Sequence, residues 1–454
     1  MSHRCLRVIL PFAILTVLTP LARADTSWRA ATAKAKITPE ASMWMSGYGA
    51  RNKPAEGTNL DLWAKTLVLE DAQGRRAALV TLDLVGIARD LSLSICDDLS
   101  EKYGLQRSQV MLAASHTHCG PVVGRNLSAM YFLEPAQLRY VDDFARRLRE
   151  TVVRLVGEAI EGLAPCSVSW ASGQATFAVN RRNNKEAEVP RLREEGRLVG
   201  PVDYDVPVLA VRDAQARLTA VVFGYACHAT VLDFYQWSGD YPGYAQKTVE
   251  DSHAGVTALF WAGCGADQNP LPRRAVDLAE AYGRQLAQAV DRVLGGVMAP
   301  VEGGLETEYS EVDLPFAALP TRAELEQQAK SSSRFEAQRG RLLLERMEAG
   351  KPLSPTYPYP VQCWRVGHDL RWLALGGEVV VDYALRLKGE LGRERTWVAA
   401  YANDVMAYIP SRRVLAEGGY EGGGAMVYYG LPTVWAPEVE ELIVRQAHSQ
   451  AGRN

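Results

Sequence analysis

The sequence lacks the features of several large protein classes. Its 50 basic and 53 acidic residues are mixed along 454 residues, for a formal net charge of −3, so there is no basic stripe of the kind that binds a phosphate backbone, and we expect no nucleic-acid partner. No apolar run beyond the first two dozen residues is long enough to cross a bilayer. The six cysteines beyond residue 24 contain no CxxC pair, which argues against a cysteine-based zinc module and leaves their pairing open.

The N-terminal 24 residues have the pattern of a secretory signal peptide. Arg4 and Arg7 precede an apolar run at 8–21, which ends in the small-residue site Ala22-Arg23-Ala24. An uncleaved anchor is the alternative, but the run is short and contains two prolines. We therefore predict an exported, periplasmic or extracellular protein that begins near Asp25, with about 430 residues left for one large or two ordinary domains.

The pattern of strands and helices predicts an α/β fold, with mixed β-sheets flanked by helices. Five apolar, β-branched runs each stop at a small or polar cluster, as a buried strand does before a loop: 109–114, 218–226, 256–262, 370–375 and 396–400. Amphipathic stretches that fit covering helices lie between them: 90–103, 135–164, 274–294 and 380–391. Because ligands bind beyond the carboxyl ends of strands in such folds, we expect the site where the five clusters lie. The polar segment 320–355 is predicted to be a helical insert.

His116 and His118 follow the first of these strands. In extended backbone, residues two apart face the same side, so both imidazoles could address one metal ion or form a histidine pair. A short H-x-H motif also occurs without function, as packing alone. His228 ends the second strand, where a buried histidine bonded to the backbone is the alternative.

His116, His228 and Glu378 together offer the mixed nitrogen and oxygen ligands of a catalytic zinc site. Glu378 also follows two glycines at the start of a predicted helix, where the helix dipole alone favours an acid. Asp267 is predicted either to cap the next helix along the chain or to orient a catalytic histidine. Arg181, beside Asn180, could bind a carboxylate or a polar head group, although such arginines often face solvent.

In order along the chain, these motifs resemble the catalytic domain of the neutral/alkaline, non-lysosomal ceramidases. The likeness rests on ordered segments similar to those of the family: Met45-Ser-Gly-Tyr48, Ala114-Ser-His-Thr-His-Cys-Gly-Pro121, Asn180-Arg181, Ala226-Cys-His-Ala-Thr230, Gly376-Gly-Glu378 and Asn403-Asp-Val-Met-Ala-Tyr-Ile409. The resemblance implies a domain spanning 25–454.

Further expectations follow from that resemblance alone. It implies zinc bound by His116, His228, Glu378 and Tyr408, with His118 close by and Arg181 contacting the substrate. One position departs from the family: the Gly265–Pro270 turn carries Gln268 or Asn269 where the family has a serine, and we take Asn269 as the corresponding catalytic position. We also expect no immunoglobulin-like C-terminal domain.

We therefore expect an exported zinc hydrolase that cleaves an amide of an N-acyl lipid or another small amide. Zinc would activate water with help from His118 or Asp267, while Tyr408 or Arg181 steadies the oxyanion or the polar head. A lipid substrate would involve transient contact with a membrane surface, and the oligomeric state stays open. The alternatives are a hydrolase of an ester or a cell-wall amide on the same scaffold, and a non-catalytic zinc-binding envelope protein.

Overall fold

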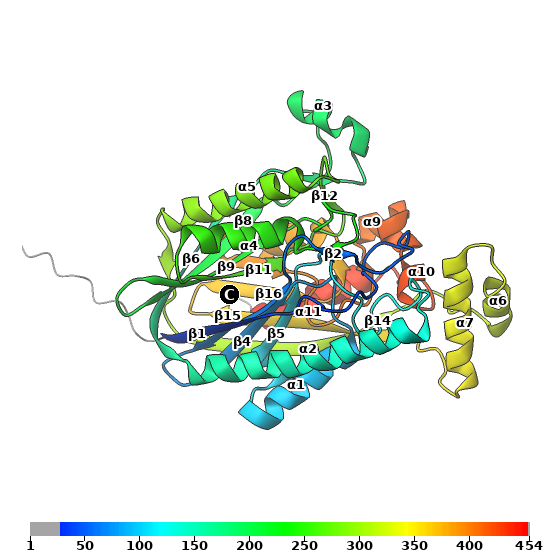
Figure 1. Ribbon diagram of the computed structural model, residues 1–454, viewed down its shortest axis with the longest axis horizontal. Helices are drawn as coiled ribbons and strands as arrows, with labels where there is room; N and C mark the ends of the chain where they lie inside the picture. The colour runs from blue at the N-terminus through cyan, green and yellow to red at the C-terminus, as the bar shows by residue number, and fades with distance from the viewer. Residues whose placement is uncertain (1–27, 453–454) are drawn as a thin grey trace, which may run out of the picture.

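The computed structural model describes residues 28–452, and the predicted signal peptide at 1–24 lies outside that range. Among the described residues, no helix has both the length and the apolar character needed to span a membrane. The described chain forms two main β-sheets with helices on their outer faces, and three two-stranded sheets (Figure 1). The predicted mixed α/β class is therefore confirmed.

The larger sheet has nine strands in the described range, and most of its neighbours run antiparallel. Its order is β11-β9-β8-β6-β1-β3-β4-β5, with β13 paired to β6. The bounds are β1 Trp28–Lys36, β3 Trp63–Glu70, β4 Arg76–Leu82, β5 Val110–Ala114, β6 Ala164–Gln174, β8 Asp205–Asp213, β9 Leu218–Tyr225, β11 Thr257–Ala262 and β13 Ala299–Pro300. Only the β4/β5 and β9/β11 pairs are parallel.

Four long helices cover the outer face of this sheet. They are α1 Arg89–Tyr103, α2 Pro135–Glu161, α4 Asp240–Ser252 and α5 Val276–Leu294. On α2 the buried positions Val141, Phe144, Leu148 and Val152 recur every three or four residues, which makes one apolar stripe along the helix. That stripe faces β1 and β3, while α4 and α5 cover β11, β6 and β8 (Figure 1).

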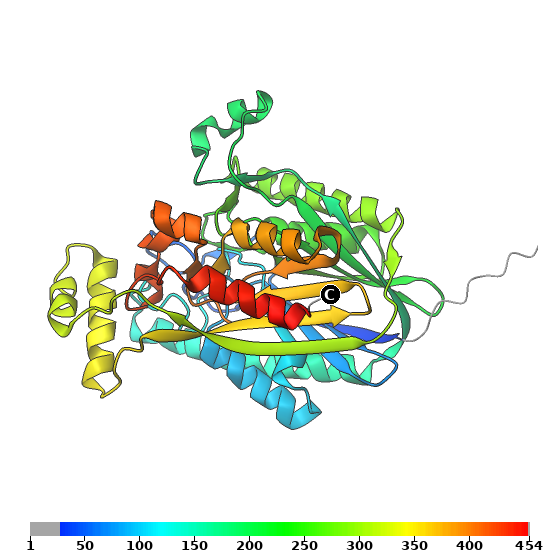
Figure 2. The ribbon, with the colours of Figure 1, turned by 180° about the vertical axis from the view of Figure 1, so that it is seen from behind.

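The smaller sheet has the order β14-β15-β16-β18, with β16 and β18 parallel. Its strands are β14 Leu305–Pro315, β15 Thr356–Val366, β16 Leu370–Leu375 and β18 Thr396–Ala399. Helices α8 Val381–Leu391 and α11 Val439–Ala451 pack on its outer face (Figure 2). All five predicted strands and all four predicted helices are present, with bounds that differ by three residues or fewer.

The two sheets pack face to face through a core rich in tryptophan. Because side chains alternate along a strand, one set points between the sheets and the other toward the helices. Trp261 of the large sheet contacts Trp372 and Trp397 of the small one, with ring centroids 5.5 and 6.3 Å apart. Isolated bridges also join the sheets, pairing Ala113 with Ala402 and Gly263 with Ala399.

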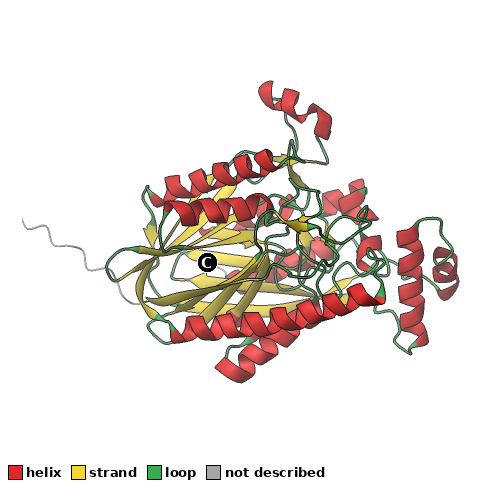
Figure 3. Cartoon of the chain, in the orientation of Figure 1, coloured by secondary structure: helices red, strands yellow, loops and turns green. Residues whose placement is uncertain are grey.

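Those bridges bring the carboxyl ends of strands from both sheets to one end of the molecule. Loops gather there, as Figure 3 shows, and the five polar clusters lie among them. Short strand pairs brace the loops: β17 Glu378–Val379 with β19 Tyr408–Ile409, β7 Ala178–Asn180 with β12 Gln268–Pro270, and β2 Gly57–Thr58 with β10 Gln236–Trp237.

The predicted insert at 320–355 contains two helices, α6 Arg322–Gln328 and α7 Arg334–Glu348, which project beyond the sheets (Figure 1). A capping box between Thr321 and Glu324 starts α6. The insert meets the body through Phe335, whose ring centroid lies 4.9 Å from that of Tyr428. The remaining short helices are α3 Val189–Glu194, α9 Arg412–Glu417 and α10 Met426–Tyr429, of which α10 buries Met426 and Tyr429.

Candidate metal centre

His116 and His228 lie in the loops after β5 and β9, and a backbone carbonyl orients each ring. The Nδ1 atom of His116 donates to the carbonyl oxygen of Val85 at 2.6 Å, and that of His228 donates to Gly265 at 2.8 Å. Because each Nδ1 carries the proton of that bond, each Nε2 is left as the free ligand atom. Both side chains are buried.

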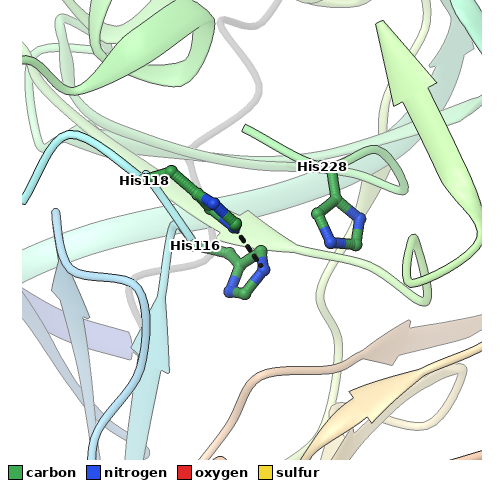
Figure 4. A group of neighbouring side chains, drawn as sticks. All are labelled: His116, His118 and His228. Carbon is green, nitrogen blue, oxygen red and sulfur yellow. Dashed lines mark hydrogen bonds between the residues drawn. The ribbon is translucent and has the colours of Figure 1, made fainter. Parts of the chain in front are cut away.

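The backbone reasoning behind the H-x-H prediction is wrong, although the histidines do meet. His116 is not extended: its φ is +60°, in the left-handed region. The chain therefore turns between His116 and His118, and the Nε2 atoms of the two rings come within 3.1 Å (Figure 4). With His228 they form a cluster whose potential ligand atoms all lie within 4.8 Å of one another.

Gly47 fits against the face of His118 that looks away from this cluster. A Cβ atom at position 47 would lie 2.5 Å from Nδ1 of His118, and the φ of Gly47 is +93°, so only glycine is accommodated. Nδ1 of His118 is buried and has no hydrogen-bond partner. Nε2 of His118, 3.1 Å from Nε2 of His116, is therefore the nitrogen of this ring that faces the cluster.

Glu378 is brought to the histidines by β17, which runs parallel to β19 with Glu378 opposite Tyr408. The preceding Gly377 has a φ of +73° and lets the chain turn sharply out of the small sheet. Oε2 of Glu378 lies 3.2 Å from Nε2 of both His116 and His228. Oε1 accepts a hydrogen bond from the Tyr429 hydroxyl.

The protonation of this cluster fits a bound cation. Burial lowers the pKa of His228 to about 4, helped by the charge of Arg181. Burial alone would raise the pKa of Glu378, but the facing His116 and His228 hold it well below its usual range. Nε2 of His228 therefore faces a carboxylate oxygen that has no hydrogen-bond partner. A metal ion between these atoms would satisfy both.

His118 shares this environment and stays neutral. Burial lowers its pKa well below the usual value, and the charges of His116 and His228 add to the effect. Its ring lies 4.7 Å from that of Tyr48, centroid to centroid. A neutral imidazole at the wall of a cleft can accept a proton during a reaction.

Tyr408 also lies within reach of the cluster. Its hydroxyl donates to Nε2 of His228 at 3.2 Å and accepts from Nη2 of Arg181 at 3.1 Å. Burial raises the pKa of Tyr408 well above its usual value, and the Glu378 charge adds to the shift. The hydroxyl is therefore a neutral donor in the metal-free chain. The four residues that the family resemblance implies as ligands thus lie close together, with Tyr408 against His228 and Glu378 against both His116 and His228.

Arg181 and Asn269 face the same cleft. Nη1 of Arg181 donates to Oδ1 of Asn269 at 3.1 Å. The side chain of Gln268 instead points into the protein, where its amide donates to the Ala226 carbonyl at 2.6 Å. Asn269 is therefore the residue of the turn that can meet a substrate.

Asp267 and Asn180 lie behind the part of the cleft surface that Arg181 and Asn269 form. One carboxylate oxygen of Asp267 accepts from the backbone N–H of Val381, the first residue of α8, at 2.9 Å, and the other accepts from the Asn180 side chain at 3.0 Å. Burial raises the pKa of Asp267 to about 6. Asp267 therefore does not cap the next helix, α5, as one alternative had it; it bonds the first turn of α8, more than 100 residues further along the chain. Asn180 holds Asp267 and does not itself line the cleft.

The cleft has a volume of about 610 Å³. Its floor carries the metal-centre residues His118, His228 and Tyr408, and its walls are largely charged or polar. The residues of the walls are Gly47, Tyr48, Arg181, Arg182, Asn184, Glu186, Thr230, Asn269, Leu271, Arg273, Glu417, Gly418, Gly419, Tyr420 and Glu421. The histidine cluster can therefore be reached by a small molecule.

Sequence reasoning missed two side chains of this site. Tyr429, in the short helix α10, donates a hydrogen bond to Glu378. Glu421, in the glycine-rich loop at 418–424, accepts a hydrogen bond from Arg181. Neither belongs to a motif or a strand end. The only available signal was the glycine-rich loop itself, which indicates close approach of the backbone to another surface.

Comparison with known proteins identifies the family. The sequence model described as "Neutral/alkaline non-lysosomal ceramidase, N-terminal" matches residues 29–271, more than half of the chain. The chain belongs to this family. The resemblance noted from the ordered motifs is thereby confirmed.

Among its relatives, the neutral ceramidase of Pseudomonas aeruginosa is 28% identical over 344 residues, which make up 71% of this chain and 50% of that protein. Neutral ceramidase 1 of Arabidopsis thaliana is 26% identical over 249 residues, or 54% of this chain and 32% of that protein. The chain thus spans half or less of the length of these relatives.

Solved structures of the family have the same fold. The crystal structure of the Pseudomonas aeruginosa neutral ceramidase matches with a TM-score of 0.71 at 23% identity, covering 94% of this chain and 74% of that one. A structure titled as ceramidase complexed with C2 matches with a TM-score of 0.72 at 20% identity, covering 94% and 75%. At these identities the likeness establishes the fold.

Proposed function

We propose that the chain is a zinc-dependent hydrolase of an amide bond, with an N-acyl lipid or a related small amide as substrate. The observation that carries this proposal is the cluster of His116, His228 and Glu378, in which Oε2 of Glu378 has no hydrogen-bond partner and lies 3.2 Å from Nε2 of both histidines. His228 of this cluster lines a cleft large enough for part of such a substrate.

Zinc is the ion that this donor set favours. Two imidazole nitrogens and one carboxylate oxygen are typical ligands of catalytic zinc, which usually has three protein ligands. Tyr408 lies at hydrogen-bonding distance from His228 and is a fourth candidate ligand. When bound, zinc supplies a Lewis acid that polarises a carbonyl group and activates water.

The residues around the cluster have separate tasks in this proposal. His118 is neutral and lines the cleft, so it can take the proton that the nucleophile loses. Arg181 and Tyr408 present N–H and O–H donors on the same wall, where they can stabilise the oxyanion of a tetrahedral intermediate. Asn269 bonds Arg181 and can bind a polar group of the substrate.

Family membership supports the choice of bond. The relatives are named neutral ceramidases, and one solved neighbour was complexed with C2. A ceramide-like lipid is therefore the first substrate to test. One observation favours a second candidate, the hydrolysis of another amide or an ester: Asn269 stands at the cleft in the turn where the family resemblance leads us to expect a serine.

We also propose that the protein is exported and acts in the periplasm or outside the cell, with transient contact to a membrane surface. The pattern of residues 1–24 supports export. The six cysteines of the described range are all buried and free, so they are shielded in an oxidising compartment. N-terminal sequencing of protein recovered from the cell exterior or periplasm should begin near Asp25; an intact N-terminus in the cytoplasm would contradict export.

Turnover of a panel of N-acyl substrates, with and without a chelator, tests the hydrolase. His116→Ala and Glu378→Ala should abolish turnover, and chelation should do the same to the wild type. His253→Ala is a matched control, because His253 pairs with Asp291 away from the cleft, and it should retain activity. Full turnover in either cluster variant would end the proposal. Turnover of esters alone would favour the second candidate, and stoichiometric zinc without any turnover would indicate a non-catalytic protein.

A further inference from the structure

We propose that Glu421 is a positioning residue that fixes the Arg181 guanidinium for the reaction. This inference rests on the proposed function, because it assigns Arg181 to the substrate side of the cleft. It concerns the loop at 418–424, in which five of seven residues are glycine.

Arg181 is held at both its backbone and its side chain. Its backbone N–H donates to the carbonyl oxygen of Asp267 at 2.8 Å. Its side chain donates one hydrogen bond to each of three acceptors: from Nε to Glu421 at 2.7 Å, from Nη1 to Asn269 at 3.1 Å and from Nη2 to the Tyr408 hydroxyl at 3.1 Å. A guanidinium has five N–H groups, so one on Nη1 and one on Nη2 remain for a substrate.

Of these three acceptors, Glu421 is the one that carries a charge. The Glu421 side chain is only 5% exposed. Charge-assisted bonds are shorter and stronger than neutral ones, and the Nε contact is the shortest of the three. Arg181 also lies beside a site that fits a metal cation, so an uncompensated guanidinium there would be repelled. Glu421 therefore both orients and neutralises Arg181.

The same carboxylate anchors the loop. Oε2 of Glu421 accepts from Nη1 of Arg182 at 2.6 Å, and Nη2 of Arg182 donates to the Gly418 carbonyl at 3.1 Å. The five glycines of the loop have no side chains to pack. The pairs of Glu421 with two consecutive arginines thus tie this wall of the cleft to the end of β7, together with the Arg182–Glu417 ion pair and the Tyr420 ring beside Arg181.

A double-mutant cycle in kcat/KM tests the assignment. Glu421→Gln should lower kcat/KM roughly 10- to 100-fold, the scale of a small displacement of a catalytic group, mainly through kcat if Arg181 acts in the transition state. In an Arg181→Met background the same substitution should have almost no further effect, because its target is gone. Wild-type kcat/KM in Glu421→Gln, or fully additive losses, would overturn the proposal.

Glu441→Gln is the matched control. Glu441 accepts from Arg386 at 2.8 Å on the surface helix α11, so the same chemical change there should leave kcat/KM unaltered. If Glu421→Gln fails to fold, Arg181→Lys provides the second test, since lysine keeps the charge but cannot reach three acceptors at once. It should lose kcat/KM to a similar extent, and wild-type activity would overturn the proposal.

Hydrogen exchange of the loop separates this inference from the proposed function. Amides at 417–424 should exchange faster in Glu421→Gln than in the wild type, whether or not a substrate is known. Faster exchange in Glu421→Gln, together with a wild type that turns over no amide, would refute the hydrolase and leave the anchoring by Glu421 supported. Unchanged exchange would overturn that anchoring even in an active enzyme.

Discussion

Removing the Tyr429 hydroxyl group tests the metal centre with the least disturbance of the structure. This hydroxyl donates to Oε1 of Glu378, the oxygen opposite the one that faces His116 and His228. The Tyr429→Phe substitution removes one hydroxyl group and keeps the ring in place. Glu378 then lacks the donor that orients its carboxylate.

The size of the effect follows from two independent estimates. A hydrogen bond to a charged group contributes about 1.5–3 kcal/mol, which at about 1.4 kcal/mol per factor of ten is roughly 10- to 100-fold in an equilibrium constant. Partners of metal ligands, when mutated, typically cost the same 10- to 100-fold in metal affinity. We therefore expect Tyr429→Phe to bind zinc roughly 10- to 100-fold more weakly than the wild type.

The assay is competition for zinc between the metal-free protein and a chromophoric chelator at fixed pH. Tyr428→Phe is the matched control: Tyr428 neighbours Tyr429 in α10 and packs its ring on Phe335 and Tyr420, away from Glu378. It should bind zinc as the wild type does. Equal affinity of Tyr429→Phe and wild type, or equal weakening in both variants, would refute the reasoning.

Three further outcomes are expected. Zinc at 100 times its dissociation constant should raise the free energy of unfolding by about 2.7 kcal/mol, seen as a rise in Tm that chelation reverses and that His116→Ala abolishes; equal shifts in both proteins would contradict the site. In the metal-free chain, His228 has a folded pKa of about 4 against 6.5 when unfolded. The stability that the neutral His228 ring gives the folded state is therefore complete above pH 6.5 and is lost as the pH falls toward 4. The stability difference between wild type and His228→Gln should therefore shrink by about 3 kcal/mol over that window, and a constant difference in urea titrations would show that His228 is not held neutral. Asp267→Asn places an amide donor against the Asn180 donor and should cost about 1–3 kcal/mol in urea denaturation; an unchanged midpoint would exclude a structural role for the carboxylate.

The elements of the fold could be predicted because each leaves a local signal. Strands such as 218–225 are apolar runs that stop at polar residues, and α2 carries its buried positions at a period of three to four. The division into two facing sheets could not be predicted in this way. It depends on which strands pair, and β14 joins β15 across the whole insert.

The candidate site was predictable where its residues follow strands. His116 and His228 lie directly after β5 and β9, and Glu378 follows β16, so the topology of an α/β fold brings them together. The reason given for His116 and His118 was nevertheless wrong, because a left-handed residue at 116, not extended backbone, turns the two rings toward each other.

Tyr408 came only from the family resemblance, and Tyr429 and Glu421 from the structure. All three act through contacts with residues far away in sequence, such as Glu421 with Arg181. The spacing of residues in the sequence does not predict such a contact, since it depends on the position that a loop with little regular structure takes in the folded chain.

The central claim is that one zinc ion binds between His116, His228 and Glu378. The most direct test is a crystal of the protein prepared with zinc, with anomalous diffraction measured on both sides of the zinc absorption edge and metal content measured in solution. The account predicts close to one zinc per chain and an anomalous peak within bonding distance of Nε2 of His116, Nε2 of His228 and Oε2 of Glu378. Zinc-saturated crystals with no peak at these three atoms would contradict it.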